Sequence, residues 1–402
     1  MVHLKYIVVE KERKILEKNL KRRGITDINL EALVKLNMQV SEMEQELGQL
    51  QEQKNTAAKI KDVKLGAAIK EKSSKLIEAL RPLQAQLFAA QDAIPNILMD
   101  DVPDGGEGDG KILRTVGDKP LIDKPKDHIQ LGTDLNILDI ERATKTSGSR
   151  FYFLKNQAVE LEFAIVRWVM DLLKSRGFEL MVPPVLINEK IMNAGGYLGK
   201  AADEVYRVQD DLYLVGTSEQ AMLGYHALEI VDVPKRYAAF STCFRREAGS
   251  YGKDVKGMIR THQFDKVEMF AYVTPPDSAQ EQEALLAIQE EIMRGLEIPY
   301  RVVLLAAEDT SSFASARTID IESWIPSQDR YRETHSVSNC TDWQAEKAGI
   351  RYEKGKLVHT LNGTAIAIGR TLVAMWENHQ RSDGSIKIPK ALHPYLSFKE
   401  IK

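Results

Sequence analysis

Two separate stretches of the chain carry arginines in positions suited to binding an anionic ligand. The first stretch, FRREAGSYGKDVKGMIRTHQFDKVEMF (244–270), places Arg245, Arg246 and Glu247 at the end of one apolar run. A Gly-rich charged loop follows and leads to Arg260 and a second apolar run, which predicts a hairpin with a long loop. A guanidinium group is planar and bonds two phosphate oxygens at once, so Arg245 and Arg260 could face one ligand from the two strands. A basic surface hairpin is the alternative interpretation.

The second stretch is LNGTAIAIGRTLVAMWENHQ (361–380), in which we expect a strand to end at Asn362-Gly363 and a helix with apolar periodicity to follow. Arg370 lies inside this otherwise apolar sequence. Burying an arginine without a partner is costly, so Arg370 should have an anionic partner, either a ligand or a structural carboxylate. The chain lacks the GxxxxGK[ST] pattern of a P-loop, so nucleotide phosphates would have to be held in another way.

The elements before these stretches begin with a helical region over residues 29–97. Two apolar seams with 3,4 spacing run through it, which is typical of a coiled coil. The first seam is Leu33, Leu36, Val40, Met43, Leu47 and Leu50, and the second is Ile69, Ser73, Leu76, Leu80, Leu83, Leu87, Ala90 and Ile94. We therefore expect an antiparallel hairpin whose first helix covers about 29–60, with Gly66 as the breaker and Pro82 kinking the second helix.

The distal end of this predicted hairpin is basic. Residues 51–75 contain seven lysines and three acidic residues, so their net charge is +4. The lysines are Lys54, Lys59, Lys61, Lys64, Lys70, Lys72 and Lys75. Such a run is either a solvated helix surface or an arm that binds phosphates.

The remainder of the chain predicts an α+β domain. The Gly/Asp-rich segment 100–111 is typical of a linker, and its glycines do not match GxGxxG. Runs of neighbouring strands with few helical crossovers favour an antiparallel sheet. The expected helices are 155–176 and 278–296, and the expected strands are 212–216, 266–273, 300–306, 318–325 and 356–363.

Composition narrows the class of protein. The 402 residues carry a formal net charge of −3, so no global positive field indicates DNA binding, and any nucleic-acid contact needs a local basic patch. The two cysteines, Cys243 and Cys340, form no CxxC pair, which favours reduced, buried thiols. We expect no signal peptide and no membrane span, and therefore a cytoplasmic protein.

The two arginine stretches resemble the second and third signature motifs of class II aminoacyl-tRNA synthetases. The sequence RGFELMVPPVLIN (176–188) resembles their first motif, a helix running into a strand that ends at Pro184. Within this class, the amino-acid sequence is most similar to that of seryl-tRNA synthetases. Fragments that carry this resemblance are TSGSRFYFLKNQAVELE, TSEQA, FRREAGSYGKD, IRTHQFDKVE, DIESWIPSQ, YRETHSVSNCTDWQA and LNGTAIAIGRTLVA. The resemblance covers nearly the whole chain, including the helical arm.

The resemblance implies an α+β fold with a six- to seven-stranded antiparallel sheet flanked by helices, preceded by an antiparallel coiled-coil arm. It implies a tRNA-binding domain at 1–110 and a catalytic domain at 111–402. The implied activity is formation of seryl-adenylate from L-serine and ATP, followed by transfer to tRNA-Ser and also to the selenocysteine tRNA. A homodimer is implied, with the first motif at its interface and the arm gripping the long variable arm of the tRNA. The lysine-rich tip is then expected to contact phosphates.

Individual roles follow from the same resemblance. Arg245 would hold the α-phosphate and the serine carboxylate, and Arg370, helped by Arg260, would clamp the γ-phosphate. Glu247 would bond the adenine amino group, and Phe264 would stack on the adenine face. Three residues implied in catalysis are Arg245, Arg370 and Glu333, and further ATP-binding positions are Arg246, Thr334, His335 and Ser336. The implied serine pocket consists of Thr217, Ser218, Glu219, Arg245 and Glu268, closed by Asn362 and Thr364.

Glu333 and Ser336 resemble the pair that ligates Mg²⁺ in this family, and oxygen ligands suit that ion. In ETHSVSNC, His335 and Val337 occupy positions where Ser and Cys are commoner in this family. They flank the implied Mg²⁺ ligands, so this departure affects the expected geometry of the metal site. A buried Glu268 that accepts the serine hydroxyl would reject alanine, whereas threonine needs a steric wall, which we assign to Thr364.

Two other classes of protein remain as alternatives. One is a synthetase paralogue that passes its amino acid to a carrier protein or small molecule, and the long regular arm argues against it. The other is an inactive coiled-coil scaffold, against which the intact Arg245, Glu247, Glu333 and Arg370 argue.

Overall fold

The chain folds into two compact units, Met1–Ile97 and Leu98–Lys402. The computed structural model describes residues 1–198, 202–248, 257–310 and 313–402. The sequence placed a boundary at residue 110, but the segment that follows Ile97 packs on the second unit. The Met99 amide donates to the Ala316 carbonyl, and Leu98 and Val102 pack against Ala307.

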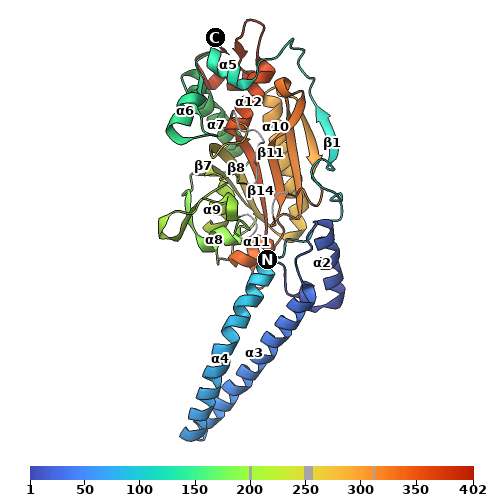
Figure 1. Cartoon of the computed structure of the whole chain (residues 1–402), viewed down its shortest axis with the longest axis vertical. Coiled ribbons are helices and arrows are strands. Elements are labelled where there is room, and N and C mark those ends of the chain that lie inside the picture. Colours follow the sequence, from blue (N-terminus) through green and yellow to red (C-terminus); the bar gives the residue numbers. More distant parts are fainter. Residues whose placement is uncertain (199–201, 249–256, 311–312) are drawn as a thin grey trace. The chain divides into compact units, whose positions relative to one another are not determined.

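The first unit is helical. Its elements are α1 (Lys5–Val8), α2 (Glu10–Arg22), α3 (Leu30–Lys59) and α4 (Val63–Asp92). The long helices α3 and α4 lie side by side as a hairpin (Figure 1), which confirms the predicted coiled-coil arm. Leu50 and Ala57 of α3 pack against Ile69 and Leu76 of α4, as the two apolar seams require.

The turn of the hairpin is not at Gly66, as the sequence suggested, but at residues 60–62. Lys61 adopts a left-handed conformation there, with φ of 54°. The Asp62 side chain then caps α4 by accepting a 2.9 Å hydrogen bond from the Leu65 amide. A capping aspartate satisfies an amide at the helix start, so it sets the boundary, and Gly66 lies within the first turns of α4. Helix α4 continues through Pro82 to Asp92.

The second unit is built on an eight-stranded sheet with the order β1-β9-β10-β11-β14-β8-β7-β4. All neighbouring pairs are antiparallel except β4 and β7. The strands are β1 (Lys111–Val116), β4 (Glu179–Met181), β7 (Lys235–Phe244), β8 (Gln263–Val273), β9 (Tyr300–Leu304), β10 (Arg317–Ile325), β11 (Arg330–Asn339) and β14 (His359–Ala367). The sheet exceeds the expected six to seven strands, and the segment after the predicted linker provides the edge strand β1.

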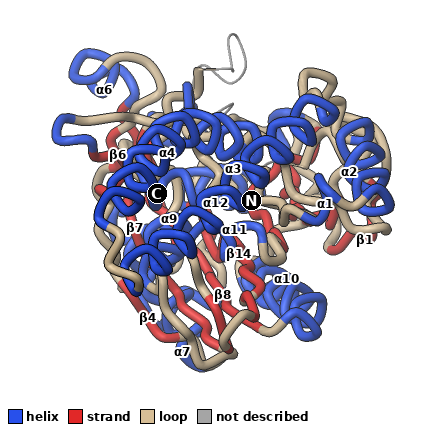
Figure 2. The backbone as a smooth tube through the Cα atoms, turned by 90° about the horizontal axis from the view of Figure 1, so that it is seen from below, coloured by secondary structure: helices blue, strands red, loops and turns tan. Residues whose placement is uncertain are grey.

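The two faces of the sheet have different roles. On one face, Val267, Met269 and Ala271 of β8 enter the main core, which is formed with α7 (Gln157–Ser175), α10 (Ser278–Gly295) and α12 (Ile368–His379). On the other face, Phe270 and Tyr272 pack with α9 (Ser218–Tyr225) and α11 (Trp343–Ala348). Figure 2 shows β7, β8 and β14 side by side among these helices. Side chains alternate between the faces of a strand, so even-numbered residues of β8 face the α9 side.

Smaller elements complete the second unit. They are α5 (His128–Asp134), β2 (Leu138–Asp139), α6 (Ile140–Ser147), β3 (Phe153–Leu154), β5 (Leu186–Asn188), α8 (Glu189–Ala194), β6 (Leu212–Leu214), β12 (Arg351–Glu353), β13 (Lys356–Leu357), β15 (Ile386–Lys387) and β16 (Glu400–Ile401). Short 3-10 segments lie at Ala202–Glu204, Gln209–Asp211, Pro275–Asp277, Pro326–Gln328 and Lys390–Tyr395. Among the described residues, no helix is long and apolar enough to cross a membrane.

The predicted helices and most predicted strands are present with small shifts of their ends. The predicted strand 356–363 is two elements, β13 and β14, and β14 continues to Ala367 instead of ending at Asn362-Gly363. Helix α12 consequently begins at Ile368, two residues before Arg370. The apolar sequence of residues 364–368 fits a buried strand as well as a buried helix, so its periodicity could not locate the boundary.

Candidate active site

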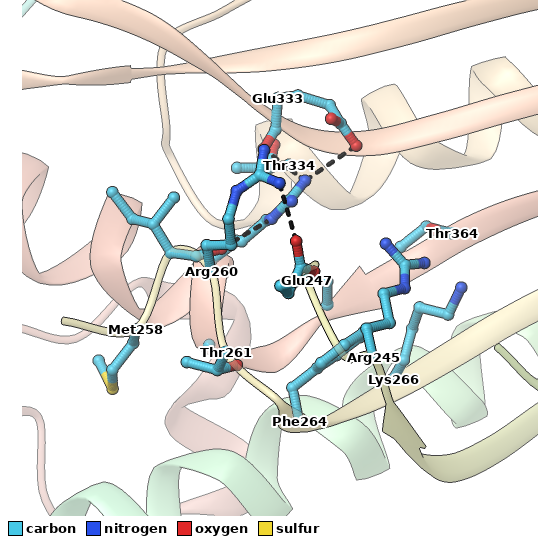
Figure 3. Close-up of a pocket in the computed structure, with 14 residues that line it drawn as sticks. Arg245, Glu247, Met258, Arg260, Thr261, Phe264, Lys266, Glu333, Thr334 and Thr364 are labelled. Carbon is cyan, nitrogen blue, oxygen red and sulfur yellow. Dashed lines mark hydrogen bonds and ion pairs between the residues drawn. The ribbon is translucent and has the colours of Figure 1, made fainter. Parts of the chain in front are cut away.

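One pocket in the second unit brings the two arginine stretches together. The space in it that protein atoms do not fill is about 480 Å³, counting the open solvent at its mouth. Arg245 follows β7, and Arg370 belongs to the first turn of α12, and both line this pocket. The other lining residues are Glu247, Met258, Ile259, Arg260, Thr261, Phe264, Lys266, Glu333, Thr334, Thr364, Ala367 and Gly369. Figure 3 shows how these side chains surround the cavity.

Arg370 has a carboxylate partner inside the pocket. Its Nη1 lies 2.9 Å from Glu333 Oε1 and donates to the Glu333 carbonyl at 3.2 Å. Its Nε donates to the Ile259 carbonyl at 3.1 Å. Burial opposes ionisation of Glu333, but the positive charges of Arg370 and Arg245 outweigh it and lower the pKa of Glu333. The pocket therefore favours the ionised form of Glu333, which is paired with Arg370.

A β-bulge explains how Glu333 and Ser336 can act together. Residues three apart on a regular strand point to opposite faces. In the pairing of β10 with β11, Ser336 lies opposite Asp320 and Glu333 lies opposite Glu322, with the register shifting between them. Because Asp320 and Glu322 are two apart on a regular strand, Glu333 and Ser336 share one face of the sheet. The three-residue spacing of Glu333 and Ser336 did not by itself indicate this extra residue on β11, which brings the two side chains to one face.

The hairpin stretch supplies a second ion pair and a cation–π contact. Arg260 Nη1 donates to Glu247 Oε2 at 2.8 Å, as the dashed line in Figure 3 marks. The Arg245 guanidinium lies 5.3 Å from the centre of the Phe264 ring, and its Nε donates to the Gly216 carbonyl at 3.2 Å. The predicted loop between the two apolar runs lies, from 249 to 256, outside the described residues.

Beyond Phe264 the pocket is lined by Lys266 and Thr364, which contact a glutamate and a second threonine just outside the lining. Lys266 Nζ lies 2.5 Å from Glu268 Oε2 and donates to Thr217 Oγ1 at 2.7 Å. Thr364, opposite Glu268 in the register of β14 and β8, donates from Oγ1 to Glu268 Oε2 at 3.2 Å. The Lys266 and Glu268 side chains are only 5% and 2% exposed, so the ion pair is shielded from solvent.

Lys266 is the functional candidate that the sequence analysis missed. Phe264, Lys266 and Glu268 occupy alternate positions of β8 and therefore share one face of the strand. Two of the three were already assigned to ligand binding, so this alternation was a signal that could have identified the lysine.

Glu219, at the start of α9, is held by two neighbours. Tyr197 donates its hydroxyl to Oε2 at 2.8 Å, and Gln344 Nε2 donates to Oε1 at 2.7 Å. Gln344 is in turn fixed by the Thr360 hydroxyl, which donates to its Oε1 at 2.7 Å. Burial and the nearby charge of Glu268 raise the pKa of Glu219, although both hydrogen bonds oppose the shift.

Several predicted site residues are not among the described residues that line the pocket. Arg246 is exposed. His335 pairs with Ile321 on the core side of the sheet, and burial lowers its pKa to about 4. Ser218 shares a 2.7 Å hydrogen bond with the hydroxyl of Ser241 on β7. Asn362, Ser336, Thr217, Glu219 and Glu268 also lie outside the lining, although Thr217 and Glu268 contact Lys266, which belongs to it.

The lysine-rich tip of the arm belongs to the first unit. All seven predicted lysines are exposed. Lys72 pairs with Glu46 at 2.8 Å and Lys75 pairs with Glu71 at 2.7 Å. The remaining five, Lys54, Lys59, Lys61, Lys64 and Lys70, form no ion pair within the part of the chain that the structure describes.

Comparison with known proteins identifies the class that this sheet and pocket define. Residues 204–379, which contain all the described residues that line the pocket, match the family model of the class II tRNA synthetase core domain for G, H, P, S and T. Relatives described as serine–tRNA ligases include that of Rhodococcus jostii, 48% identical over 84% of this chain and 82% of the relative. The serine–tRNA ligase of Mycolicibacterium smegmatis is 49% identical over 80% of this chain and 79% of the relative.

Comparison with solved structures leads to the same family. The crystal structure of seryl-tRNA synthetase from Pyrococcus horikoshii complexed with ATP superimposes with a TM-score of 0.92 and 35% identity, covering 100% of this chain and 99% of that one. The chain belongs to the serine–tRNA ligase family.

Proposed function

We propose that this chain activates L-serine with ATP to form seryl-adenylate and then transfers the seryl group to tRNA-Ser. The observation that carries the proposal is the convergence of Arg245 and Arg370 on one pocket that is also lined by Thr364 and Lys266, both of which contact the buried Glu268 just outside the lining. A bent triphosphate and a small hydroxyl-bearing amino acid match these two ends in charge and size. The Pyrococcus horikoshii relative is described as complexed with ATP, which supports the nucleotide assignment.

Adenylate formation requires positioning and charge neutralisation more than acid–base chemistry. The serine carboxylate attacks the α-phosphorus in line, and pyrophosphate leaves. Arg245 would orient the carboxylate and the α-phosphate, and Arg370 and Arg260 would neutralise the β- and γ-phosphates. The Nε of Arg260 is buried and has no hydrogen-bond partner within the described ranges, so this side chain has a spare donor for an anion.

The adenine would occupy the Phe264 end of the pocket. In the structure the Arg245 guanidinium covers the Phe264 ring, and Arg260 holds Glu247. We propose that ATP takes the place of the guanidinium on the ring, with Glu247 accepting from the adenine amino group. Arg246 and Thr334 would help to form the ATP-binding end of the pocket. His335 would do so without contacting the adenine, since it lies on the core side of the sheet.

The residues around Glu333 suit a magnesium ion. The carboxylate of Glu333 and the hydroxyl of Ser336 share one face, and both are hard oxygen donors. Asp320, opposite Ser336, keeps its buried Oδ1 without a hydrogen-bond partner among the residues described, so the site has spare acceptor capacity. We assign Glu333 and Ser336 as the residues that would hold Mg²⁺, which would supply positive charge to offset that of the ATP phosphates.

The buried Glu268 accounts for serine selection. As an acceptor for the serine hydroxyl it would be left unpaired by alanine, and such a site rejects the deoxy analogue by about 10⁴–10⁵. Glu219, fixed by Tyr197 and Gln344, is the acceptor proposed for the serine ammonium group. Thr364 is the proposed wall against the extra methyl group of threonine, with Asn362 closing the pocket beside it.

The arm and a second copy of the chain are proposed to complete the tRNA site. The exposed lysines at the tip, five of which form no ion pair with any residue that the structure describes, suit the phosphate backbone of the long variable arm. Apolar side chains from α7 through β5 are exposed, including Phe163 at 64% and Val182 at 78%, and they suit a homodimer interface at the first motif. The selenocysteine tRNA, also charged with serine, is proposed as a second substrate of the same arm.

Charging of purified tRNA-Ser with labelled serine tests the proposal. We expect charging of tRNA-Ser, and loss of charging when its long variable arm is shortened. A matched variant without residues 30–95 should lose charging but keep serine-dependent ATP–pyrophosphate exchange. Equal loss of both activities in that variant would contradict the division of labour, and adenylate formation without charging of any tRNA would favour a paralogue with another acceptor.

A further inference from the structure

His128 is a buried residue that none of the signature motifs includes. It is the first residue of α5, it is 4% exposed, and it is not among the described residues that line the pocket. Its ring nevertheless touches the hairpin stretch that the pocket uses. Each ring nitrogen has one hydrogen-bond partner, the Met258 amide or the Glu377 carboxylate.

The two ring nitrogens have different hydrogen-bonding roles. The Met258 amide donates to Nε2 at 3.2 Å, so Nε2 must carry a lone pair. Nδ1 lies 3.2 Å from Glu377 Oε1 and therefore carries the proton and donates it to that carboxylate. Glu377 is itself fixed, because the amides of His128 and Ser327 donate to its two oxygens at 3.0 Å each. Glu377 thus selects the Nδ1–H tautomer, the neutral form that can hold the Met258 amide.

Met258 is the first described residue after the gap at 249–256 that lines the pocket. Its successor Ile259 supplies the carbonyl that accepts from Arg370 Nε, and the next residue is Arg260, which pairs with Glu247. Glu377 lies on the same helix as Arg370, seven residues or two turns later. His128 therefore connects the helix that carries one phosphate-binding arginine to the backbone that carries the other.

The packing around this connection leaves no room for adjustment. A Cβ at Gly257, which has φ of 89°, would lie 2.2 Å from His128 Nε2. A Cβ at Gly369, next to Arg370, would lie 2.9 Å from the Met258 carbonyl. Side chains at either position would displace the imidazole or the backbone that it holds, so the close approach depends on two glycines.

We propose that His128, oriented by Glu377, is a positioning residue for ATP that sets Arg260 relative to Arg370. It acts through the Met258 amide and does not touch the nucleotide itself. The proposal rests on the proposed function for the identity of the ligand, and it assigns a role to the PKDH sequence at 125–128 that the motifs leave unexplained. The alternative is an ordinary core histidine that contributes stability alone.

Two substitutions distinguish these interpretations. A glutamine side chain can place its carbonyl oxygen near the position of Nε2, so His128→Gln keeps an acceptor for the Met258 amide. An asparagine side chain reaches only the position of Nδ1, so His128→Asn keeps the Glu377 contact and leaves the amide unpaired. An unpaired buried amide is costly, and we expect His128→Asn to raise the KM for ATP on the order of tenfold. His128→Gln should stay within about threefold of the wild type, and the KM for serine should change little in either variant.

The measurements are serine-dependent ATP–pyrophosphate exchange, ATP binding by calorimetry and the thermal unfolding midpoint. Equal effects of the two variants on ATP, or equal changes in the KM values for ATP and serine, would overturn the proposal in favour of a stability role. Calorimetry keeps the test separate from the proposed function, because ATP binding is measured even if the wild type does not exchange with serine.

A measurement on the wild type covers the case in which the variants do not fold. ¹⁵N NMR of the histidine rings should show His128 as the Nδ1–H tautomer, with Nε2 unprotonated and accepting a hydrogen bond. A protonated Nε2 in the folded protein at neutral pH would overturn the proposal, because that nitrogen could not accept from the Met258 amide.

Discussion

Replacing Lys266 with methionine tests whether the buried ion pair with Glu268 underlies serine recognition. The ammonium group lies 2.5 Å from Glu268 Oε2, and the two side chains are 5% and 2% exposed. Without it, the one remaining hydrogen bond to Glu268 from the described residues is that of the Thr364 hydroxyl at 3.2 Å. The carboxylate must then stay charged in a desolvated site or take up a proton, and either outcome weakens it as an acceptor for the serine hydroxyl.

The size of the effect follows from the cost of breaking a buried pair. Removing one partner of a buried ion pair costs about 3–5 kcal/mol. If about 3 kcal/mol of this appears in serine binding, kcat/KM for serine falls roughly 100-fold, since about 1.4 kcal/mol corresponds to a factor of ten. The KM for ATP should change far less, because Lys266 lies at the end of the pocket that we propose for serine. Pyrophosphate exchange at saturating ATP and varied serine measures both constants.

A double-mutant cycle provides the matched control for this prediction. In Glu268→Gln the amide needs no cation, so adding Lys266→Met should cause little further loss. Losses that multiply in the double variant, or an unchanged KM for serine in the single variant, would refute the reasoning. The thermal midpoint of each variant separates lost recognition from lost folding.

Three further predictions concern other parts of the chain. Burial and a hydrogen bond that protonated Glu162 donates to the Asp265 carboxylate raise the pKa of Glu162 from 4.5 to about 8, so folding takes up a proton and stability falls as pH rises across this window. Glu162→Gln should reduce that fall and raise the thermal midpoint relative to the wild type at pH 8.5, and an unchanged pH profile would count against it. Tyr197→Phe removes one of the two hydrogen bonds to Glu219 and should raise the KM for serine about fivefold, with the KM for ATP unchanged. Charge reversal at Lys61 and Lys64 should weaken tRNA binding and reduce the salt dependence of that binding, while serine-dependent ATP–pyrophosphate exchange persists. If tRNA binding and pyrophosphate exchange fell equally, the role of these lysines would not be confined to tRNA binding.

The sequence predicted helices and strands well where a local pattern was repeated over many residues. The seams of the arm specified two long helices, and alternation in the strands specified a mostly antiparallel sheet. The turn of the arm depends instead on a single capping interaction, between the Asp62 side chain and the Leu65 amide, which outweighed Gly66 as a breaker. The boundary between β14 and α12 lies in an apolar sequence that suits both elements, so pattern alone could not locate it.

The arrangement of the site depended on features that sequence spacing does not carry. Glu333 and Ser336 face the same way only because the register of β10 and β11 shifts between them. His335 lies on the core side because it is next to Ser336 in the regular part of the register, where adjacent side chains point to opposite faces. Lys266 was not distinguished from an ordinary strand residue, because its importance comes from burial beside Glu268, and burial of a lysine is rarely predicted from sequence.

Serine-dependent ATP–pyrophosphate exchange by the full chain tests the central claim most directly, since it needs both ends of the pocket at once. We predict that label passes from pyrophosphate into ATP only with serine, and that Arg245→Ala and Arg370→Ala each abolish this exchange. Exchange that is indifferent to serine, or that survives loss of either arginine, would contradict the account.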